Sequence, residues 1–190
     1  MRITTFTADA FEGQFALRLL DSCRAFGIEV DHFGVSGDEG PRHSVRLRCL
    51  LRSLRAGKAD ALYVDPDAQL LRRPEIALEE KDFDVGVYYD SKTLELSGPL
   101  FLRNTPRIAP LLREWGAVNK AYPDNSEMAN LSRALAEPGH SLTVRRLPVT
   151  YAWVERLHRT TYPQAQPVIV HFKGDGLETL PFQRPKTGRF

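Results

Sequence analysis

The segment ALYVDPDAQLL, residues 61–71, decides how the fold of this chain is interpreted. Its first four residues form a short, wholly apolar run, which is typical of a central strand that is covered on both faces. Asp65 and Asp67 follow this run directly. We therefore expect both carboxylates at the carboxyl end of a buried strand, where open α/β sheets bind their ligands.

Strand and helix patterns alternate on both sides of this segment. Strand patterns occur at residues 3–8, 28–35, 61–64, 84–89, 99–104, 142–147 and 167–172. Apolar stripes of helical spacing lie between them at residues 16–23, 47–54, 108–115 and 128–135. This alternation predicts a Rossmann-like α/β/α sandwich around a mainly parallel central sheet. We expect one domain over residues 1–179 and an irregular basic tail at residues 180–190.

Thr105 and Pro106 are expected to start the third helix, because a capping residue followed by proline suits a helix N-terminus. Pro110 lies inside the same stripe. Since an internal proline removes a helical hydrogen bond, it is expected to delay the regular part of the helix or to kink it.

The composition is that of a globular protein and limits its chemistry. Of 190 residues, 42% are hydrophobic and 26% charged, and the net charge of +2 is too small to indicate a partner by itself. We find no apolar stretch long enough for a signal peptide or a membrane span, so we expect a cytoplasmic protein. Cys23 and Cys49 lack metal or redox spacing and are interpreted as two buried thiols.

The Asp65-Pro66-Asp67 sequence suggests a cation site. In an extended segment, residues i and i+2 share a face with Cα atoms roughly 6 to 7 Å apart. Two carboxylates at that distance repel each other by about 2 to 3 kcal/mol at an effective dielectric constant near 20, and a divalent cation reverses the penalty. Hard oxygen ligands suit Mg²⁺ or Mn²⁺. The alternative is a solvated turn, because Asp-Pro-Asp is also favourable turn chemistry.

Several further segments carry a resemblance to a known family. ALYVDPDAQLLRRP resembles the hydrophobic strand, DxD motif and following residues of GT-A nucleotide-diphospho-sugar glycosyltransferases. SGPLFLRNTP (97–106) is similar to a second signature of that family, a glycine-containing turn that enters a strand. Trp115, the helix around Glu127, Leu147-Pro148 and VIVHFKG (168–174) then appear in the family's order. The resemblance covers approximately residues 44–174.

The resemblance implies a GT-A fold and a metal-dependent donor site. On this interpretation Asp67 is a direct ligand of Mn²⁺ or Mg²⁺, Asp65 contacts the metal or the donor ribose, and His171 is the third metal ligand. The resemblance also implies a nucleotide-sugar donor, and among these we expect a UDP-sugar first.

Other residues are expected around the donor. Lys173 and Gly174, in the loop after His171, are candidates for the diphosphate. Arg42 or Arg46, at the start of the Arg-rich helix, are further phosphate candidates, although a solvated face also explains that helix. Gly98 would let the sugar approach the backbone closely, or is an ordinary turn glycine.

Glu127 and Asp124 are the candidate catalytic residues. If either carboxylate is a general base on an acceptor hydroxyl, the enzyme inverts the sugar configuration; otherwise a retaining mechanism stays open. Asp124 and Glu127 also fit a capping box, in which the glutamate only completes a helix end. The sequence leaves both interpretations open.

Two other function classes are compatible with parts of the sequence. A strand followed by DxD also describes haloacid-dehalogenase-like phosphatases, and the Arg-rich helix suits a non-catalytic module that binds nucleic acid or a partner. For a glycosyltransferase, the acceptor is a saccharide, a protein, a metabolite or a nucleic-acid base. Because the chain is short for this family, its acceptor-binding part is either reduced to residues 120–160 and the basic tail or supplied by a partner protein or a second subunit of a homo-oligomer.

Overall fold

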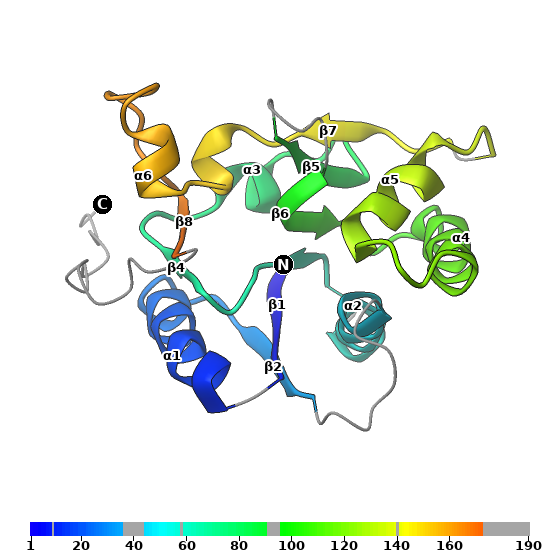
Figure 1. Cartoon of the computed structure of the whole chain (residues 1–190), viewed down its shortest axis with the longest axis horizontal. Helices are drawn as coiled ribbons and strands as arrows, with labels where there is room; N and C mark the ends of the chain where they lie inside the picture. Colours follow the sequence, from blue (N-terminus) through cyan, green and yellow to red (C-terminus); the bar gives the residue numbers. More distant parts are fainter. Residues whose placement is uncertain (9, 36–43, 58, 91–95, 140, 173–190) are drawn as a thin grey trace.

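The computed structural model describes residues 1–8, 10–35, 44–57, 59–90, 96–139 and 141–172. Along these residues the elements follow in the order β1 (Arg2–Thr7), α1 (Ala10–Ala25), β2 (Val30–Gly34), α2 (Val45–Gly57), β3 (Ala61–Tyr63), β4 (Ala68–Leu70), α3 (Glu75–Glu79), β5 (Val85–Tyr89), β6 (Leu96–Leu102), α4 (Ile108–Ala121), α5 (Glu127–Ala136), β7 (Val144–Arg146), η2 (Val149–Tyr151), α6 (Glu155–His158) and β8 (Ile169–His171) (Figure 1).

The central sheet has six strands in the order β2-β1-β3-β6-β5-β7. β1 pairs in parallel with β2 and β3, and β5 pairs in parallel with β7. β6 pairs antiparallel with both of its neighbours, β3 and β5. Five strands therefore run in one direction and β6 in the other, which confirms the predicted α/β sandwich with a mainly parallel sheet.

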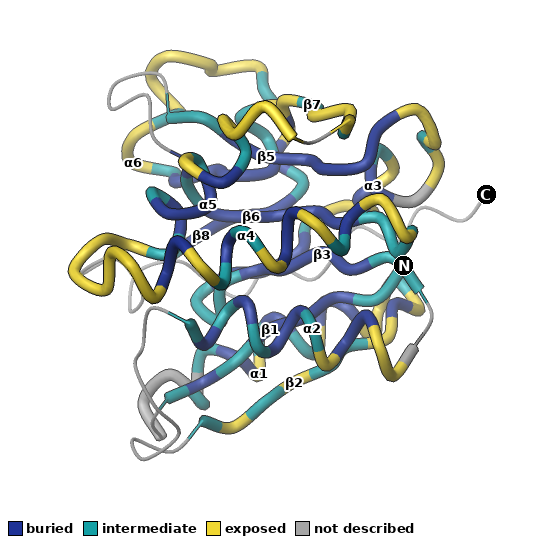
Figure 2. The backbone as a smooth tube through the Cα atoms, turned by 90° about the vertical axis from the view of Figure 1, so that its right-hand side faces the viewer, coloured by how far each residue is buried: buried dark blue, intermediate teal, exposed yellow. Residues whose placement is uncertain are grey.

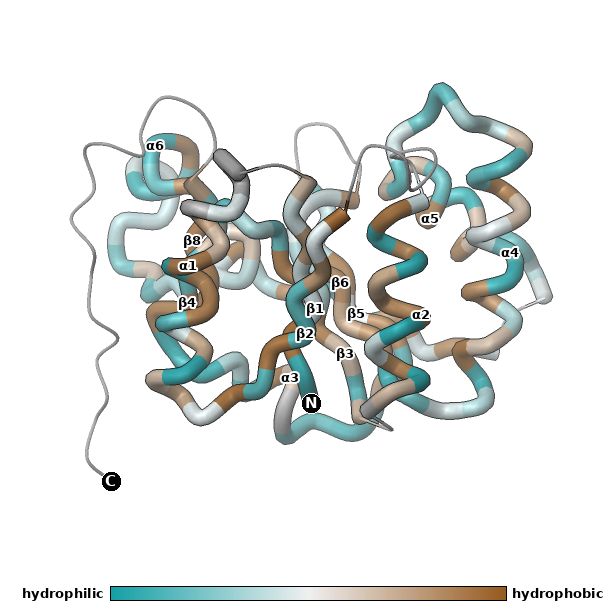
Figure 3. Tube along the Cα trace, turned by 90° about the horizontal axis from the view of Figure 1, so that it is seen from below, coloured by the Kyte–Doolittle hydropathy of each residue, from teal (hydrophilic) through white to brown (hydrophobic). Residues whose placement is uncertain are grey.

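Both faces of this sheet are covered. Along β3 and the next residue, Ala61 and Tyr63 join the apolar core under α2, α4 and α5, whereas Leu62 and Val64 join a second core under α1. All four side chains are fully buried, and β3, β5 and β6 are mainly dark blue in Figure 2. Figure 3 shows α1 on one side of the central strands and α2, α4 and α5 on the other. The predicted two-sided burial of residues 61–64 is confirmed.

A second, two-stranded sheet was not predicted as such. β4 begins immediately after Asp67 and pairs antiparallel with β8, so that Ala68 lies opposite His171. β4 packs against α1. The sequence pattern predicts β8 but neither β4 nor the short helices α3, η2 and α6. This small sheet joins the end of β3 to a segment about one hundred residues later in the chain.

Two helix starts differ from the expected ones. α4 begins at Ile108, so Pro110 falls in its first turn, where a missing N–H removes no helical hydrogen bond. The expected start with Thr105 as cap and Pro106 as first residue is wrong, because the cap is Arg107. The later start agrees with one of the two effects expected of Pro110. α5 begins at Glu127, and its cap is Ser126, whose hydroxyl accepts a hydrogen bond from Ala129 N–H. The capping box with Asp124 as cap is therefore wrong.

Two further expectations concern whole-chain properties. Cys23 and Cys49 are both buried and free, as predicted. No helix in the described part of the chain is long and apolar enough to span a membrane.

Candidate metal centre

Three potential metal ligands meet at the carboxyl end of β3. Asp65 and Asp67 follow β3, and His171 ends β8. The pairing of Ala68 with His171 brings the two segments together, and Phe172 N–H donates to the carbonyl of Asp67 over 2.8 Å. One potential ligand atom from each of the three side chains lies within 4.8 Å of the others. We call Asp65, Asp67 and His171 the metal cluster.

The route by which the two carboxylates converge differs from the expectation. Pro66 and Asp67 form a turn between β3 and β4 rather than an extended segment. The predicted same-face geometry of an extended strand is therefore wrong. The turn nevertheless directs both carboxylates toward His171, since His171 Nδ1 lies 3.9 Å from Asp65 Oδ2 and 3.9 Å from Asp67 Oδ1. The sequence suggested a turn and a pair of converging carboxylates as alternatives. In the structure Pro66 and Asp67 lie in a turn, and this turn brings the two carboxylates together.

His171 is buried, with a side chain that is only 1% exposed. Among the described residues, neither ring nitrogen has a hydrogen-bond partner, and the same is true of the buried Asp67 Oδ1. A buried polar atom without a partner costs about 1 to 3 kcal/mol, and such atoms in native proteins usually mark an ion or another bound group. The cluster therefore has the properties of a site that is completed by a ligand.

The donor set fits a divalent cation. In an octahedron with ligand atoms at about 2.1 Å from Mg²⁺ or Mn²⁺, neighbouring ligand atoms lie about 3.0 Å apart and opposite ones about 4.2 Å apart. The two histidine–carboxylate distances of 3.9 Å lie between these values, so the three side chains are close enough to share one ion after small side-chain movements. Mg²⁺ sites usually consist of oxygen ligands alone. An imidazole beside two carboxylates therefore favours Mn²⁺ over Mg²⁺.

Gly98 lies beside the same histidine. It has a φ of +68° in β6, where the pairing with β5 shifts register between Val87 and Tyr89. A Cβ atom on Gly98 would lie 3.7 Å from His171 Nε2 and 3.5 Å from the Cβ of Ala152. The left-handed backbone thus requires glycine at a position that faces the metal cluster.

Arg46 connects the Arg-rich helix to the cluster. Its Nη2 lies 3.0 Å from Asp65 Oδ1, and its guanidinium lies over the ring of Tyr63, 4.4 Å from the ring centroid. Burial raises the pKa of the Tyr63 phenol well above its ordinary value, so the ring stays neutral beneath the cation. In the described part of the chain, Arg46 Nε and Nη1 are buried without a hydrogen-bond partner. Arg46 is thus a fixed cation with unused donors.

The remaining predicted residues are distributed as follows. Arg42, Lys173 and Gly174 lie outside the described residues. Asp124 is exposed in the turn before α5 and does not belong to the metal cluster.

Glu127 has a contact that the sequence did not suggest. Its carboxylate accepts hydrogen bonds from the backbone N–H groups of Arg46 (3.1 Å) and Leu47 (3.3 Å) in the first turn of α2. Burial raises the pKa of Glu127 above its ordinary value, against the opposing effect of the Arg46 charge. No local pattern could indicate this contact, because 80 residues separate Glu127 from its partners.

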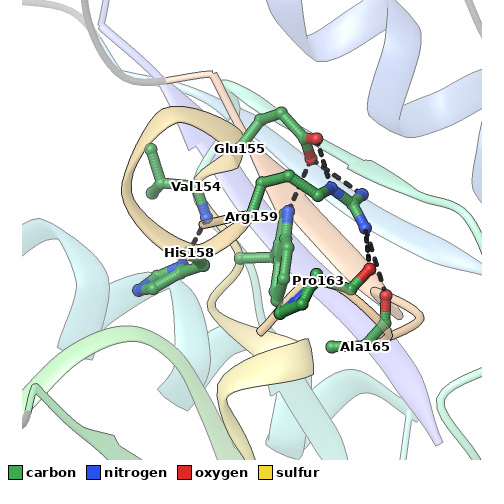
Figure 4. Close-up of polar contacts among 7 residues, drawn as sticks. Val154, Glu155, His158, Arg159, Pro163 and Ala165 are labelled. Atoms are coloured by element: carbon green, nitrogen blue, oxygen red, sulfur yellow. Dashed lines mark hydrogen bonds and ion pairs between the residues drawn. The ribbon is translucent and has the colours of Figure 1, made fainter. Parts of the chain in front are cut away.

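A polar group behind His171 was also not predicted. The carbonyl of Trp153 accepts the His171 N–H over 2.7 Å, and the Trp153 indole donates to Glu155 Oε2 over 2.7 Å. Arg159 donates to both carboxylate oxygens of Glu155, as Figure 4 shows. We call Trp153, Glu155 and Arg159 the Glu155 cluster. Only the i, i+4 spacing of Glu155 and Arg159 could have indicated part of it.

Sequence comparison finds no relative of this chain, since neither a protein-family model nor a curated protein matches it. Solved structures do match. A glycosyltransferase involved in glycosylation of the major capsid of PBCV-1 superposes with a TM-score of 0.64 at 12% identity, covering 92% of this chain and 94% of that one. GlyE of Streptococcus pneumoniae TIGR4 gives 0.60 at 11% identity (90% and 54% covered), and an active-site mutant of LgtC gives 0.57 at 15% identity (92% and 88%).

This chain has the GT-A glycosyltransferase fold. The resemblance inferred from residues 44–174 is thereby confirmed at the level of the fold. On this GT-A fold, the metal cluster lies beyond the carboxyl end of β3, the expected place for a ligand in an open α/β sheet. The comparisons favour neither the phosphatase nor the nucleic-acid-binding alternative.

Proposed function

We propose that this protein is a metal-dependent glycosyltransferase that moves a sugar from a nucleotide-diphosphate donor, a UDP-sugar first among them, to a hydroxyl acceptor. The observation that carries the proposal is the metal cluster. Asp65, Asp67 and His171 converge on a GT-A fold, and three of their buried polar atoms lack partners within the described residues.

Asp65, Asp67 and His171 would hold Mn²⁺ or Mg²⁺. When bound, the ion supplies positive charge that stabilises the departing nucleoside diphosphate, the main electrostatic requirement of glycosyl transfer. The protein would orient the three ligand side chains before the donor binds, because the β4–β8 pairing fixes His171 against the Asp65–Asp67 turn.

Arg46 would supply the second positive charge. Tyr63 and Asp65 already fix its guanidinium, so little side-chain entropy is lost when a phosphate binds. Its unused Nε and Nη1 donors suit a phosphate oxygen. Arg42, Lys173 and Gly174 remain candidates for further phosphate contacts, from the resemblance alone. Gly98 keeps the space beside His171 free of a side chain.

Thermal unfolding with UDP and Mn²⁺, separately and together, tests the proposal. At a ligand concentration 100 times Kd the stability gain is about 2.7 kcal/mol, which corresponds to roughly 5 to 10 °C for a domain of this size. We expect the large shift only when both are present. If no nucleoside diphosphate in a panel of UDP, GDP, ADP and CDP shifts Tm in the presence of Mn²⁺ or Mg²⁺, the proposed function is wrong.

A further inference from the structure

Glu127 joins two helices that are distant in the sequence. It is the first residue of α5, and its two carboxylate oxygens accept the N–H groups of Arg46 and Leu47 in α2. The first N–H groups of a helix have no partner within the helix. α2 has no acidic residue of its own in its first turn. Glu127 therefore supplies, from another helix, the negative charge that the N-terminus of α2 lacks.

Glu127 is itself held in place. The indole of Trp115, in α4, donates to the Glu127 carbonyl over 3.0 Å, and Ser126 caps the start of α5. Trp115 is fully buried in the core. The backbone of Glu127 is thus fixed by α4, and its side chain in turn fixes the start of α2.

The contact between Glu127 and α2 leads to the proposed donor site. Arg46, whose backbone N–H is bound by Glu127, reaches Asp65 with its side chain. A series of direct contacts therefore runs from Trp115 through Glu127 and Arg46 to the metal cluster. Any movement of the first turn of α2 would move the guanidinium relative to Asp65.

We propose that Glu127 is a positioning residue for Arg46 and not the base that removes the acceptor proton. Both of its oxygens already accept hydrogen bonds from the backbone of α2, and the residue is partly buried. Its role would be to hold the α2 N-terminus so that Arg46 stays beside Asp65. This inference rests on the proposed function for its link to the donor, but the anchoring contact itself does not.

Amide hydrogen exchange of the protein without ligand tests the anchor. In Glu127→Ala the amides of Arg46 and Leu47 lose their acceptors, and we expect them to exchange about five- to tenfold faster. Glu127→Gln, which keeps the size and one acceptor oxygen, is expected to show a smaller increase. Glu137→Gln is the matched control, since Glu137 is exposed at the opposite end of α5. Unchanged exchange at Arg46 and Leu47 in Glu127→Ala would overturn the inference.

Donor binding tests the link to Arg46. With UDP and Mn²⁺ as the probe, we expect Glu127→Gln to raise the Kd by about tenfold. In an Arg46→Gln background the same substitution is expected to add less than twofold, because the residue through which it acts has already been removed. A base would behave differently: Glu127→Gln would leave the Kd unchanged. An unchanged Kd, or fully additive effects, would overturn the positioning role.

The two experiments separate the inference from the proposed function. If the wild-type protein binds no nucleoside diphosphate, the proposed function fails, while hydrogen exchange still decides whether Glu127 anchors α2. If the wild-type protein binds UDP and Mn²⁺ but Glu127→Gln binds equally well, the proposed function stands and the inference fails. Tm values near that of the wild type would show that both variants are folded.

Discussion

Two polar clusters meet at Trp153, whose carbonyl accepts the His171 N–H and whose indole donates to Glu155, and they differ in how their polar atoms are satisfied. The metal cluster is buried, yet His171 and Asp67 carry atoms without partners in the described structure. The Glu155 cluster is much more exposed, with the Arg159 side chain 45% accessible, yet Arg159 donates to Glu155 and to the carbonyls of Pro163 and Ala165 (Figure 4).

If only the stability of the fold mattered, the buried polar atoms would have hydrogen-bond partners and the exposed arginine would not need them. Water can satisfy an exposed arginine, whereas a buried imidazole without a partner is unfavourable. The difference supports the proposal that the metal cluster is completed by a ligand, whereas the Glu155 cluster already has the partners expected of a group that stabilises the fold. Substitutions that change one cluster at a time test this assignment for each cluster separately.

Asp67→Asn should have the largest effect. It removes one anionic ligand and leaves the size of the side chain unchanged, so we expect the Kd for UDP with Mn²⁺ to rise by at least about 100-fold. The Tm without ligand should stay near the wild-type value, because the substitution also removes repulsion from Asp65. Isothermal titration calorimetry and a thermal scan measure both. Asp21→Asn, on the exposed face of α1, is the control. Normal metal-dependent binding in Asp67→Asn would remove the central support for the metal cluster.

His171→Leu should separate function from stability. The substitution replaces two unpartnered buried nitrogens by apolar atoms, so we expect the protein without ligand to be more stable by about 1 kcal/mol, or roughly 2 to 4 °C. The Tm increase caused by UDP with Mn²⁺ should be lost in the same variant. A clear decrease in the Tm without ligand would mean instead that His171 stabilises the fold, contrary to the comparison of the two clusters.

The distance along the sequence between contacting residues explains which features of the fold and the site could be predicted. β3 and the adjacent Asp65 and Asp67 are local, since a hydrophobic run and the residues that follow it are contiguous. Local patterns also predicted α1, α2, α4 and the main strands. His171 was found only through the order of motifs along the chain. Its contact with Asp67 depends on β4, a strand of three residues that is too short to show a period.

The contacts of Glu127 and of the Glu155 cluster could not be predicted for the same physical reason. Glu127 caps a helix that lies 80 residues away, and Trp153 meets His171 through backbone atoms, which carry no residue-specific signal. Propensity and periodicity describe neighbours along the chain. They contain no information on which helix end a buried carboxylate reaches, because that is set by the packing of α5 against α2 and α4.

Glu155→Ala should have a moderate effect, confined to stability. It leaves the Trp153 indole N–H and the Arg159 guanidinium without their shared acceptor, so we expect a loss of about 1 kcal/mol, or roughly 2 to 4 °C in Tm. The Kd for UDP with Mn²⁺ should change by less than about twofold. Denaturant unfolding and calorimetry measure the two quantities. A tenfold loss of binding with little loss of stability would assign the Glu155 cluster to the donor site instead.

The smallest expected effect is a pH dependence of the stability that the Glu155 cluster contributes. Hydrogen bonds from Arg159, supported by the Trp153 indole and partly opposed by burial, hold the pKa of Glu155 below its ordinary value of 4.5. A lowered carboxyl pKa stabilises the folded state above the ordinary value, and this contribution is lost as the pH falls through the folded-state pKa. Because the pair is exposed to solvent, screening keeps this contribution small. The stability difference between the wild type and Glu155→Gln should therefore be constant above about pH 5 and shrink toward pH 3. A difference that grows on acidification would show that the charged form of Glu155 is not the one that the fold stabilises.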